Sequence, residues 1–217
     1  MSNYHCEATT VEGFIQQLAV CYVGRGYWFY ITGFIPPEKD PRAVDEKLIG
    51  RYGIDISKWS RARRKQTGQA SVQYLRFRQF FVLLATLGKH RFFIEEAGGI
   101  QDVRSVPIVV SGYSVSSRGG RPHVRIARSE YLRIKSYFSD LATRSAERIE
   151  AELRALRFEP YAPVRTQLLT LVRAINRKRN SAGLPPISRH CLRFKRRIYR
   201  PFEPVIDDVS QLLTGTG

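Results

Sequence analysis

Two groups of residues carry side chains suited to acid–base or metal-assisted chemistry. The first is centred on His90, which lies between Lys89 and Arg91 and is followed by Glu95 and Glu96. A histidine titrates near neutral pH, so His90 could move a proton while the neighbouring cations hold a phosphate. His90 and Glu95 are therefore candidate catalytic residues of a nuclease. A surface turn after a central strand is the alternative, and it is the interpretation we favour.

The second group is acidic and consists of Glu38, Asp40, Asp45 and Glu46. Paired carboxylates can position two divalent ions about 4 Å apart, so Asp40 and Asp45 are candidate catalytic residues of a metal-dependent nuclease. Asp40 also precedes Pro41, and an acceptor side chain before a proline is typical of a helix start. We therefore expect no cofactor, and Mg²⁺ is implied only if the protein is a nuclease.

Three clusters of Lys and Arg indicate a polyanionic partner. The clusters are Lys58, Arg61, Arg63, Arg64 and Lys65; Arg173, Arg177, Lys178 and Arg179; and Arg193, Lys195, Arg196, Arg197 and Arg200. A glycine turn adds Arg118 and Arg121. Arg predominates over Lys, and its guanidinium suits bidentate phosphate contacts and stacking on bases. We predict that these residues bind nucleic acid; the alternative is that each run is a solvated face.

The net charge of the chain is +17, and it is unevenly distributed over the 217 residues. Residues 1–57 hold 5 basic and 7 acidic side chains, whereas residues 58–217 hold 31 and 12. The surface that faces an anionic partner is therefore expected after residue 57. Neither a signal peptide nor a membrane span is recognisable, so we expect no membrane partner and a cytoplasmic or nucleoid-associated location. Cys6, Cys21 and Cys191 lack CxxC spacing and fit reduced thiols.

The first part of the chain is expected to supply a scaffold. Periodicity and turn residues predict a helix over 11–23, a strand over 27–35 and a helix over 41–52. The first basic cluster, 58–65, is expected to form a loop before strands over 71–77 and 80–86. The second of these strands is apolar at nearly every position, which is typical of a central strand buried on both faces.

The second part of the chain changes from strand to helix patterns. Strands are predicted over 103–117 and 123–127, joined as a hairpin whose tip contains Gly119 and Gly120. Helical periodicity begins at Ser129 and continues, with breaks at Pro160 and Pro163, to about residue 182. The remainder is expected to be irregular and basic, with a frayed end at residues 214–217.

These elements predict an α+β fold with a mainly antiparallel sheet and helices packed on one side. A ferredoxin-like core is one possible arrangement. The expected organisation is a sheet core over 1–128, a helical extension over 129–182 and a basic tail over 183–217.

Aromatic residues on the strand over 27–35 bear on the type of nucleic acid. Trp28, Tyr30 and Phe34 alternate onto one face, and an uncovered aromatic face stacks single-stranded bases at about 1 to 3 kcal/mol each. The alternative, which we favour, is that both faces are buried. The absence of a recognisable helix-turn-helix, zinc finger or basic zipper pattern adds to the preference for RNA or single-stranded DNA over duplex.

The sequence thus predicts a nucleic-acid-binding protein, plausible as an accessory factor of a mobile element, plasmid or ribonucleoprotein. Protein partners in a ribonucleoprotein or transposition complex would fit that role. A small metal-dependent or His-dependent nuclease is the first alternative, and a structural partner of an acidic protein is the second.

Overall fold

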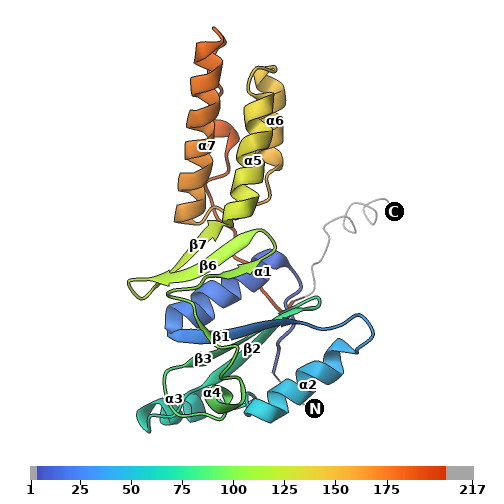
Figure 1. The fold of residues 1–217 in the computed structure, drawn as a ribbon, viewed down its shortest axis with the longest axis vertical. Coiled ribbons are helices and arrows are strands. Elements are labelled where there is room, and N and C mark those ends of the chain that lie inside the picture. Colours follow the sequence, from blue (N-terminus) through green and yellow to red (C-terminus); the bar gives the residue numbers. More distant parts are fainter. Residues whose placement is uncertain (1–3, 204–217) are drawn as a thin grey trace, which may run out of the picture. The chain divides into compact units, whose positions relative to one another are not determined.

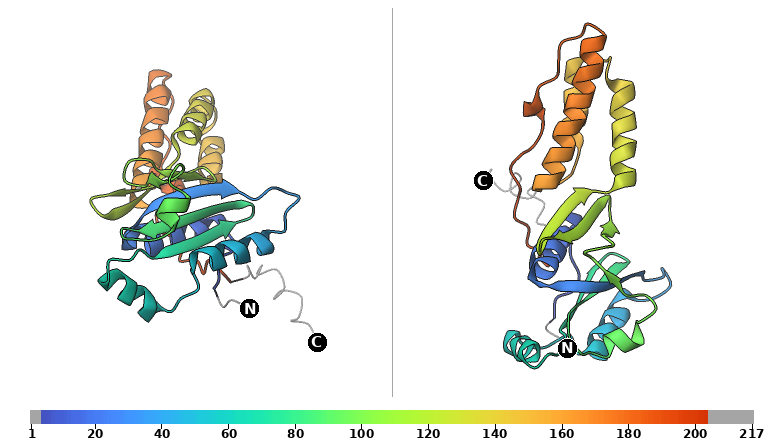
Figure 2. Two further views of the ribbon diagram at one scale, coloured as in Figure 1. Left: turned by 60° about the horizontal axis from the view of Figure 1, so that its bottom comes forward. Right: turned by 60° about the vertical axis from the view of Figure 1, so that its left-hand side comes forward.

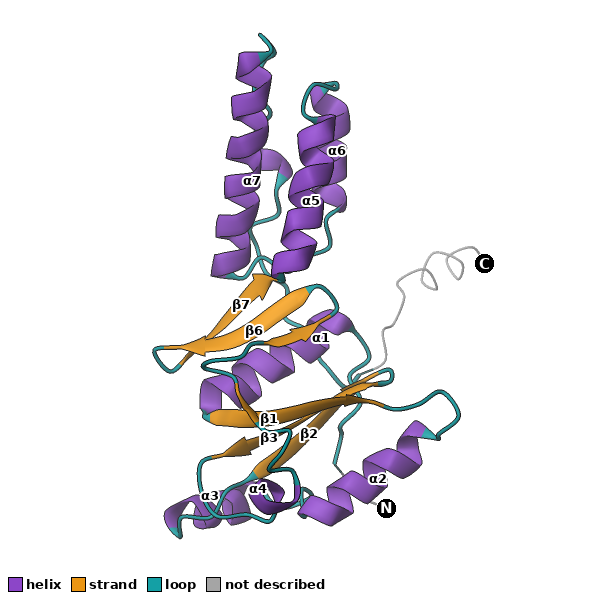
Figure 3. Ribbon diagram, viewed as in Figure 1, coloured by secondary structure: helices purple, strands orange, loops and turns teal. Residues whose placement is uncertain are grey.

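The computed structural model of the chain describes residues 4–203, so the predicted frayed end at 214–217 lies outside the described residues. Within this range the chain divides into two compact units. Unit 1 comprises residues 4–18, 29–100 and 199–203, and unit 2 comprises residues 19–28 and 101–198. Helices and antiparallel sheets give the predicted α+β class (Figure 1, Figure 3).

The strands of residues 4–203 form two sheets rather than the single sheet expected from the sequence. One sheet has the order β2-β3-β1-β4, and the other has the order β5-β6-β7. The strand bounds are β1 (Tyr27–Phe34), β2 (Val72–Phe77), β3 (Phe80–Thr86), β4 (Gln101–Asp102), β5 (Ile108–Val110), β6 (Tyr113–Arg118) and β7 (Arg121–Ile126). β3 lies inside its sheet, as predicted.

The helices of the same range include two that the sequence did not suggest, α3 and α4. The helix bounds are α1 (Val11–Gln16), α2 (Pro41–Tyr52), α3 (Lys58–Gln66), α4 (Phe92–Glu95), α5 (Arg128–Leu141), α6 (Ala146–Ala155) and α7 (Ala162–Ser181). α1 continues as a π-helix over Gln17–Tyr22 and a 3₁₀ turn over Val23–Arg25, and a further 3₁₀ turn spans Arg189–Cys191. Among the described residues, no helix has the length and apolar character that crossing a membrane requires.

The first basic cluster forms helix α3, so the predicted loop over residues 58–65 is wrong. The Ser57 hydroxyl caps the helix by accepting a hydrogen bond from the Ser60 backbone N–H at 3.1 Å. Arg63, Arg64 and Lys65 occupy the last turn, where their charge complements the negative end of the helix dipole. No residue of α3 is buried. Because α3 has no core-facing side, it has no apolar periodicity to reveal it in the sequence.

Helices cover both faces of the β2–β3 pair in unit 1. On one face, Tyr52 of α2 belongs to the same buried cluster as Tyr74 of β2. On the other face, the ring of Phe14 in α1 lies 6.2 Å from Phe77 and 5.9 Å from Phe80. The sequence suggested helices on one side only. Two-sided burial instead explains why β3 is apolar along almost its whole length.

A buried ion pair joins α2 to β2. Arg76 is 2% exposed and Asp45 is 6% exposed. The Arg76 Nε and Nη2 atoms donate to the two carboxylate oxygens of Asp45 at 2.9 Å each, and the Tyr74 hydroxyl donates to Asp45 Oδ1 at 2.6 Å. Arg76 also pairs with Glu7 at 3.0 Å. The charge of Asp45 is therefore neutralised by hydrogen-bonded partners inside unit 1.

The predicted strand over 103–117 is divided into β5 and β6 in unit 2. Ser111 and Gly112 between them have φ values of 46° and 80°, which turn the chain. The predicted hairpin is confirmed as β6–β7, where Gly119 and Gly120 have φ values of 55° and 72°. Positive φ at both central residues is the geometry of a two-residue hairpin turn, and glycine adopts it without steric cost.

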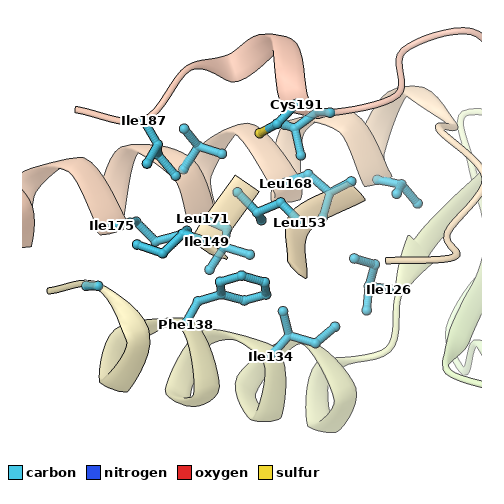
Figure 4. Close-up of a cluster of buried hydrophobic side chains, with 14 residues drawn as sticks. Ile126, Ile134, Phe138, Ile149, Leu153, Leu168, Leu171, Ile175, Ile187 and Cys191 are labelled. Carbon is cyan, nitrogen blue, oxygen red and sulfur yellow. The ribbon is translucent and has the colours of Figure 1, made fainter. Parts of the chain in front are cut away.

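The core of unit 2 lies among helices α5, α6 and α7, which run alongside one another in the views of Figure 2. Figure 4 shows apolar side chains from each helix meeting in one cluster, with Phe138 among the aliphatic residues. The labelled members are Ile134 and Phe138 of α5, Ile149 and Leu153 of α6, Leu168, Leu171 and Ile175 of α7, and Ile126, Ile187 and Cys191.

A side-chain amide attaches α7 to the edge of the three-stranded sheet. Gln167 accepts from the Ile126 backbone N–H at 2.8 Å and donates to the Ile126 carbonyl at 3.1 Å. The Tyr131 hydroxyl donates to the Gln167 carbonyl at 3.1 Å. These bonds satisfy backbone groups of an edge strand as a further strand would. The predicted boundary after residue 128 falls after the first residue of α5, inside unit 2.

The buried ion pair generates a stability prediction. Asp45→Asn leaves the Arg76 charge without its buried partner, so the free energy of unfolding should fall by about 3 kcal/mol in urea denaturation. Asp40→Asn is the matched control, because asparagine caps a helix as well as aspartate and should leave stability nearly unchanged. Equal effects of the two substitutions would contradict this role of Asp45.

Candidate nucleic-acid interface

The arginines divide into those with a carboxylate partner and those without one. The eight ion pairs of residues 4–203 use Arg51, Arg76, Arg104, Arg133, Arg154, Arg193 and Arg200. Of the predicted nucleic-acid contacts, only Arg193 and Arg200 belong to that set. The other predicted contacts have no ion pair in the described part of the chain, so their charge is not neutralised there.

Arg179 is buried, and we withdraw it from the predicted nucleic-acid contacts. It is 2% exposed, and its Nη1 donates to the carbonyls of Ala142 and Arg144 at 2.9 and 2.7 Å. Its Nε donates to the Pro185 carbonyl at 2.7 Å. The guanidinium thus satisfies three carbonyls near helix ends and is not open to a phosphate. Its neighbour Lys178 is exposed but donates to the Ser139 carbonyl at 3.0 Å.

The third basic cluster is partly engaged within unit 2. Arg193 forms an ion pair with Glu159, a carboxylate that also accepts from the Arg197 backbone N–H at 3.1 Å. The guanidinium of Arg196 lies 4.9 Å from the centre of the Tyr161 ring, a cation–π contact. These contacts hold the backbone of the segment in place. The side chains of Lys195 and Arg197 remain exposed.

The first cluster lies on α3 beside an unusually exposed tryptophan. Trp59 is 83% exposed, and Arg63 follows it by four residues, so both lie on one side of the helix. Arg61 donates to the Ile56 carbonyl at 2.7 Å, which leaves part of its guanidinium available. Lys58, Arg63 and Lys65 are exposed. This α3 surface combines positive charge with an indole ring.

The aromatic residues of β1 form neither a continuous platform nor two fully buried faces, which was the interpretation we favoured. Tyr30 is 2% exposed, while Phe34 on the same face is 74% exposed. The Phe34 ring packs edge-on against Phe80 with centroids 5.2 Å apart. A buried tyrosine in the middle of the series prevents these rings from offering successive bases a stacking surface. Trp59 on α3 is a more exposed aromatic ring, and the sequence pattern did not indicate it.

The β6–β7 hairpin and α7 line an open pocket of about 500 Å³, which we call the hairpin–helix pocket. It is lined by Arg118, His123, Arg125, Tyr131, Ala162, Pro163, Thr166, Gln167 and Thr170. None of these residues is acidic, and neither Arg118 nor Arg125 has an ion pair among residues 4–203. Only Arg118 was predicted from the sequence. The lining residues are separated by up to 52 positions in the sequence and meet because α7 packs on β7.

The exposed side of α7 continues from this pocket. Thr166, Thr170, Arg173 and Arg177 follow one another at intervals of four, three and four residues, which places them on one helix face. At a rise of about 1.5 Å per residue, this α7 row extends roughly 16 Å. Arg173 and Arg177 are exposed, and neither forms an ion pair within residues 4–203.

His123 lies in the hairpin–helix pocket with its pKa lowered. Burial is the largest cause, and the positive charges of Arg118 and Arg125 add to it. Its buried Nδ1 atom has no hydrogen-bond partner among residues 4–203. Nothing in the described part of the pocket therefore stabilises a second proton on the ring, and His123 is neutral at pH 7.

His90 holds a structural position at the start of α4. Its Nδ1 accepts from the Phe92 backbone N–H at 3.1 Å, and the ring also bonds to the backbone of Tyr52. Burial lowers the pKa of His90, and Arg64 and Arg91 lower it further. The backbone hydrogen bond to Nδ1 gives His90 a structural role in the turn before α4.

The candidate carboxylates lie in separate environments. Asp40 caps α2 by accepting from the Arg42 N–H at 3.0 Å, and Asp45 is bound by Arg76. Glu95 forms an ion pair with Arg51 at 2.8 Å. Among residues 4–203, no three His, Cys, Asp or Glu side chains gather as a metal site would require. The geometry therefore gives these residues capping and pairing roles.

The lowered pKa of His90 generates a prediction about pH. The unfolded chain binds a proton on His90 near pH 6.5, whereas the folded protein binds it only at lower pH, so protonation favours unfolding. The free energy of unfolding should therefore fall as the pH is lowered from about 7.5 to about 5.5. His90→Asn keeps an acceptor for the Phe92 N–H but does not titrate, so its pH dependence should be weaker. An unchanged slope in this variant would contradict the assignment.

The chain was also compared with known proteins. No protein-family model matches it, and no curated protein is significantly similar in sequence.

Proposed function

We propose that this protein binds nucleic acid through the α3 surface of unit 1 and through the α7 row of unit 2. The observation that carries the proposal is the partition of charge. Carboxylates neutralise one set of arginines, whereas the cations of α3 and the α7 row have no carboxylate partner among residues 4–203. Unpaired guanidinium groups on helices of defined geometry suit the regularly spaced charges of a phosphate backbone.

The α3 surface favours single-stranded ligands. A base can stack on the exposed Trp59 ring while Arg63 and Lys58 contact neighbouring phosphates. Bases of a duplex are already stacked on each other and are less accessible to an indole on a helix surface. RNA or single-stranded DNA is therefore the proposed ligand class.

The α7 row supplies a second contact of about the length of a few nucleotides. Arg173 and Arg177 lie one helical turn apart, and the hairpin residues Arg118 and Arg121 add charge in the same unit. Phosphate contacts of this kind fix position and orientation without reading sequence. We infer a binding role without strong sequence preference, as an accessory factor of a mobile element, plasmid or ribonucleoprotein. Cytoplasm or nucleoid is the corresponding location.

Neutralising the α7 row should weaken binding. In fluorescence anisotropy with a labelled single-stranded RNA, affinity should fall steeply with salt, and Arg173→Gln with Arg177→Gln should lower the slope of log K against log salt by about 1 to 2. Arg133→Gln is the matched control, because it removes one exposed charge that Glu130 already neutralises. A salt-independent signal would contradict the proposal. In that case, a partner that is an acidic protein becomes the explanation for the charge.

The nuclease alternative makes a separate prediction. Labelled RNA and DNA incubated with the purified protein, with and without Mg²⁺, should remain intact, because His90, Asp45 and Glu95 are engaged in structural contacts. Cleavage that disappears in a folded His90→Ala variant would contradict this and favour a catalytic role.

A further inference from the structure

The hairpin–helix pocket has the size and charge of a site for one nucleotide. Its volume of about 500 Å³ lies within the range of roughly 300 to 1,000 Å³ that small-molecule sites occupy. Phosphate alone would fill a small part of that space. The lining residues come from β6, β7, α5 and α7, so the pocket is built from regular elements and not from a mobile loop.

The hairpin wall of the pocket is cationic. Arg118 comes from the end of β6, while His123 and Arg125 are two residues apart on β7 and so lie on one face of that strand. A phosphate monoester carries about −1.5 to −2 charges at pH 7, whereas a backbone phosphodiester carries about one. Two guanidinium groups with no acidic neighbour in the lining match the monoester better than the diester.

The α7 wall offers a different chemistry. The Thr166 hydroxyl donates to the Ala162 carbonyl at 3.1 Å, and the Thr170 hydroxyl donates to the Thr166 carbonyl at 2.8 Å. Because each hydroxyl proton is donated to a carbonyl of α7, the two threonine oxygens can serve a ligand only as hydrogen-bond acceptors. Ala162 and Pro163 add an apolar surface. Acceptors beside an apolar wall suit the hydroxyl and amino groups and the planar ring of a nucleoside.

Two polar residues of the pocket lining, Gln167 and Tyr131, use their polar groups in hydrogen bonds within the protein. The oxygen and nitrogen of the Gln167 side-chain amide both bond to the backbone of Ile126, and the Tyr131 hydroxyl donates to the backbone carbonyl of Gln167. They hold the two walls at a fixed separation. The groups open to a ligand are therefore the cations of the hairpin and the threonine oxygens of α7.

We propose that the hairpin–helix pocket binds the phosphate monoester of a nucleotide, with the phosphate on Arg118 and Arg125 and the nucleoside against α7. The nucleotide can be the phosphorylated end of a strand or a free nucleoside monophosphate. The first case rests on the proposed nucleic-acid binding, because the strand would continue along the α7 row. The second does not depend on it.

Ligand binding is coupled to the protonation of His123. The charged or titratable groups that line the pocket around it are Arg118 of β6, Arg125 of β7 and Tyr131 of α5, and α7 contributes none to the lining. The negative charge of a phosphate bound between Arg118 and Arg125 would offset the repulsion between these two guanidinium groups and a protonated His123 ring. Binding of the phosphate should therefore raise the pKa of His123 above its lowered value in the free protein.

The test compares RNA strands whose ends carry either a phosphate or a hydroxyl group. Binding of a short RNA with a 5′-phosphate, a 3′-phosphate or hydroxyls at both ends is measured by anisotropy, and adenosine and uridine monophosphates are titrated by calorimetry. One phosphorylated end should bind about tenfold more tightly than the hydroxyl end. Arg125→Gln should abolish the difference. Arg148→Gln is the matched control, since Arg148 is an exposed arginine of the same unit that does not line the pocket and belongs to neither proposed binding surface.

The outcomes separate the two proposals. A preference for one phosphorylated end that Arg125→Gln removes supports a strand end in the pocket. Equal binding of all ends, with a monophosphate that binds the parent and not Arg125→Gln, supports a free nucleotide. If ends bind equally and neither monophosphate binds, the pocket assignment is overturned, although strand binding through the α7 row can persist. The two substituted arginines, Arg125 and the control residue, are exposed, and thermal unfolding checks that each variant is folded.

Discussion

The basic surface of unit 2 depends on one amide side chain. Gln167 bonds to both backbone groups of Ile126, and this places α7 at the edge of β7, where a further strand would otherwise pair. The helix then contributes Thr166 and Thr170 to a pocket whose other wall is the hairpin. An interaction that protects a sheet edge thus also sets the spacing between two guanidinium groups and a helix face.

Charge in this protein is divided between structure and surface. Arg76 is buried against Asp45, and Arg179 is buried against three carbonyls, so both contribute to stability despite lying in or near basic sequence. The cations of α3 and the α7 row have no carboxylate partner in residues 4–203. The net charge of +17 therefore does not distinguish the arginines that are bound inside the protein from the cations without a carboxylate partner, which are concentrated on α3 and the α7 row.

Signals that act over a few residues were readable from the sequence. Asp40 before Pro41 predicted the start of α2, and Gly119-Gly120 predicted the hairpin, because capping and turn geometry are local. α3 escaped prediction because it buries no residue, and Arg179 was indistinguishable from its exposed neighbours. The pocket was not predictable for another reason: His123, Tyr131 and Thr166 meet only through the packing of α7 on β7.

Helix α3 has a thermodynamic consequence that follows from its lack of buried residues. A nine-residue helix with no buried residue is held by its Ser57 cap, its dipole-complementing charges and the contacts of Arg61 and Arg64 with the rest of the protein, and isolated helices of this length are marginal in water. We therefore expect its backbone amides to be weakly protected in hydrogen exchange. A ligand that stacks on Trp59 must first hold this segment ordered, so part of the contact energy is spent on conformational entropy and binding can remain readily reversible.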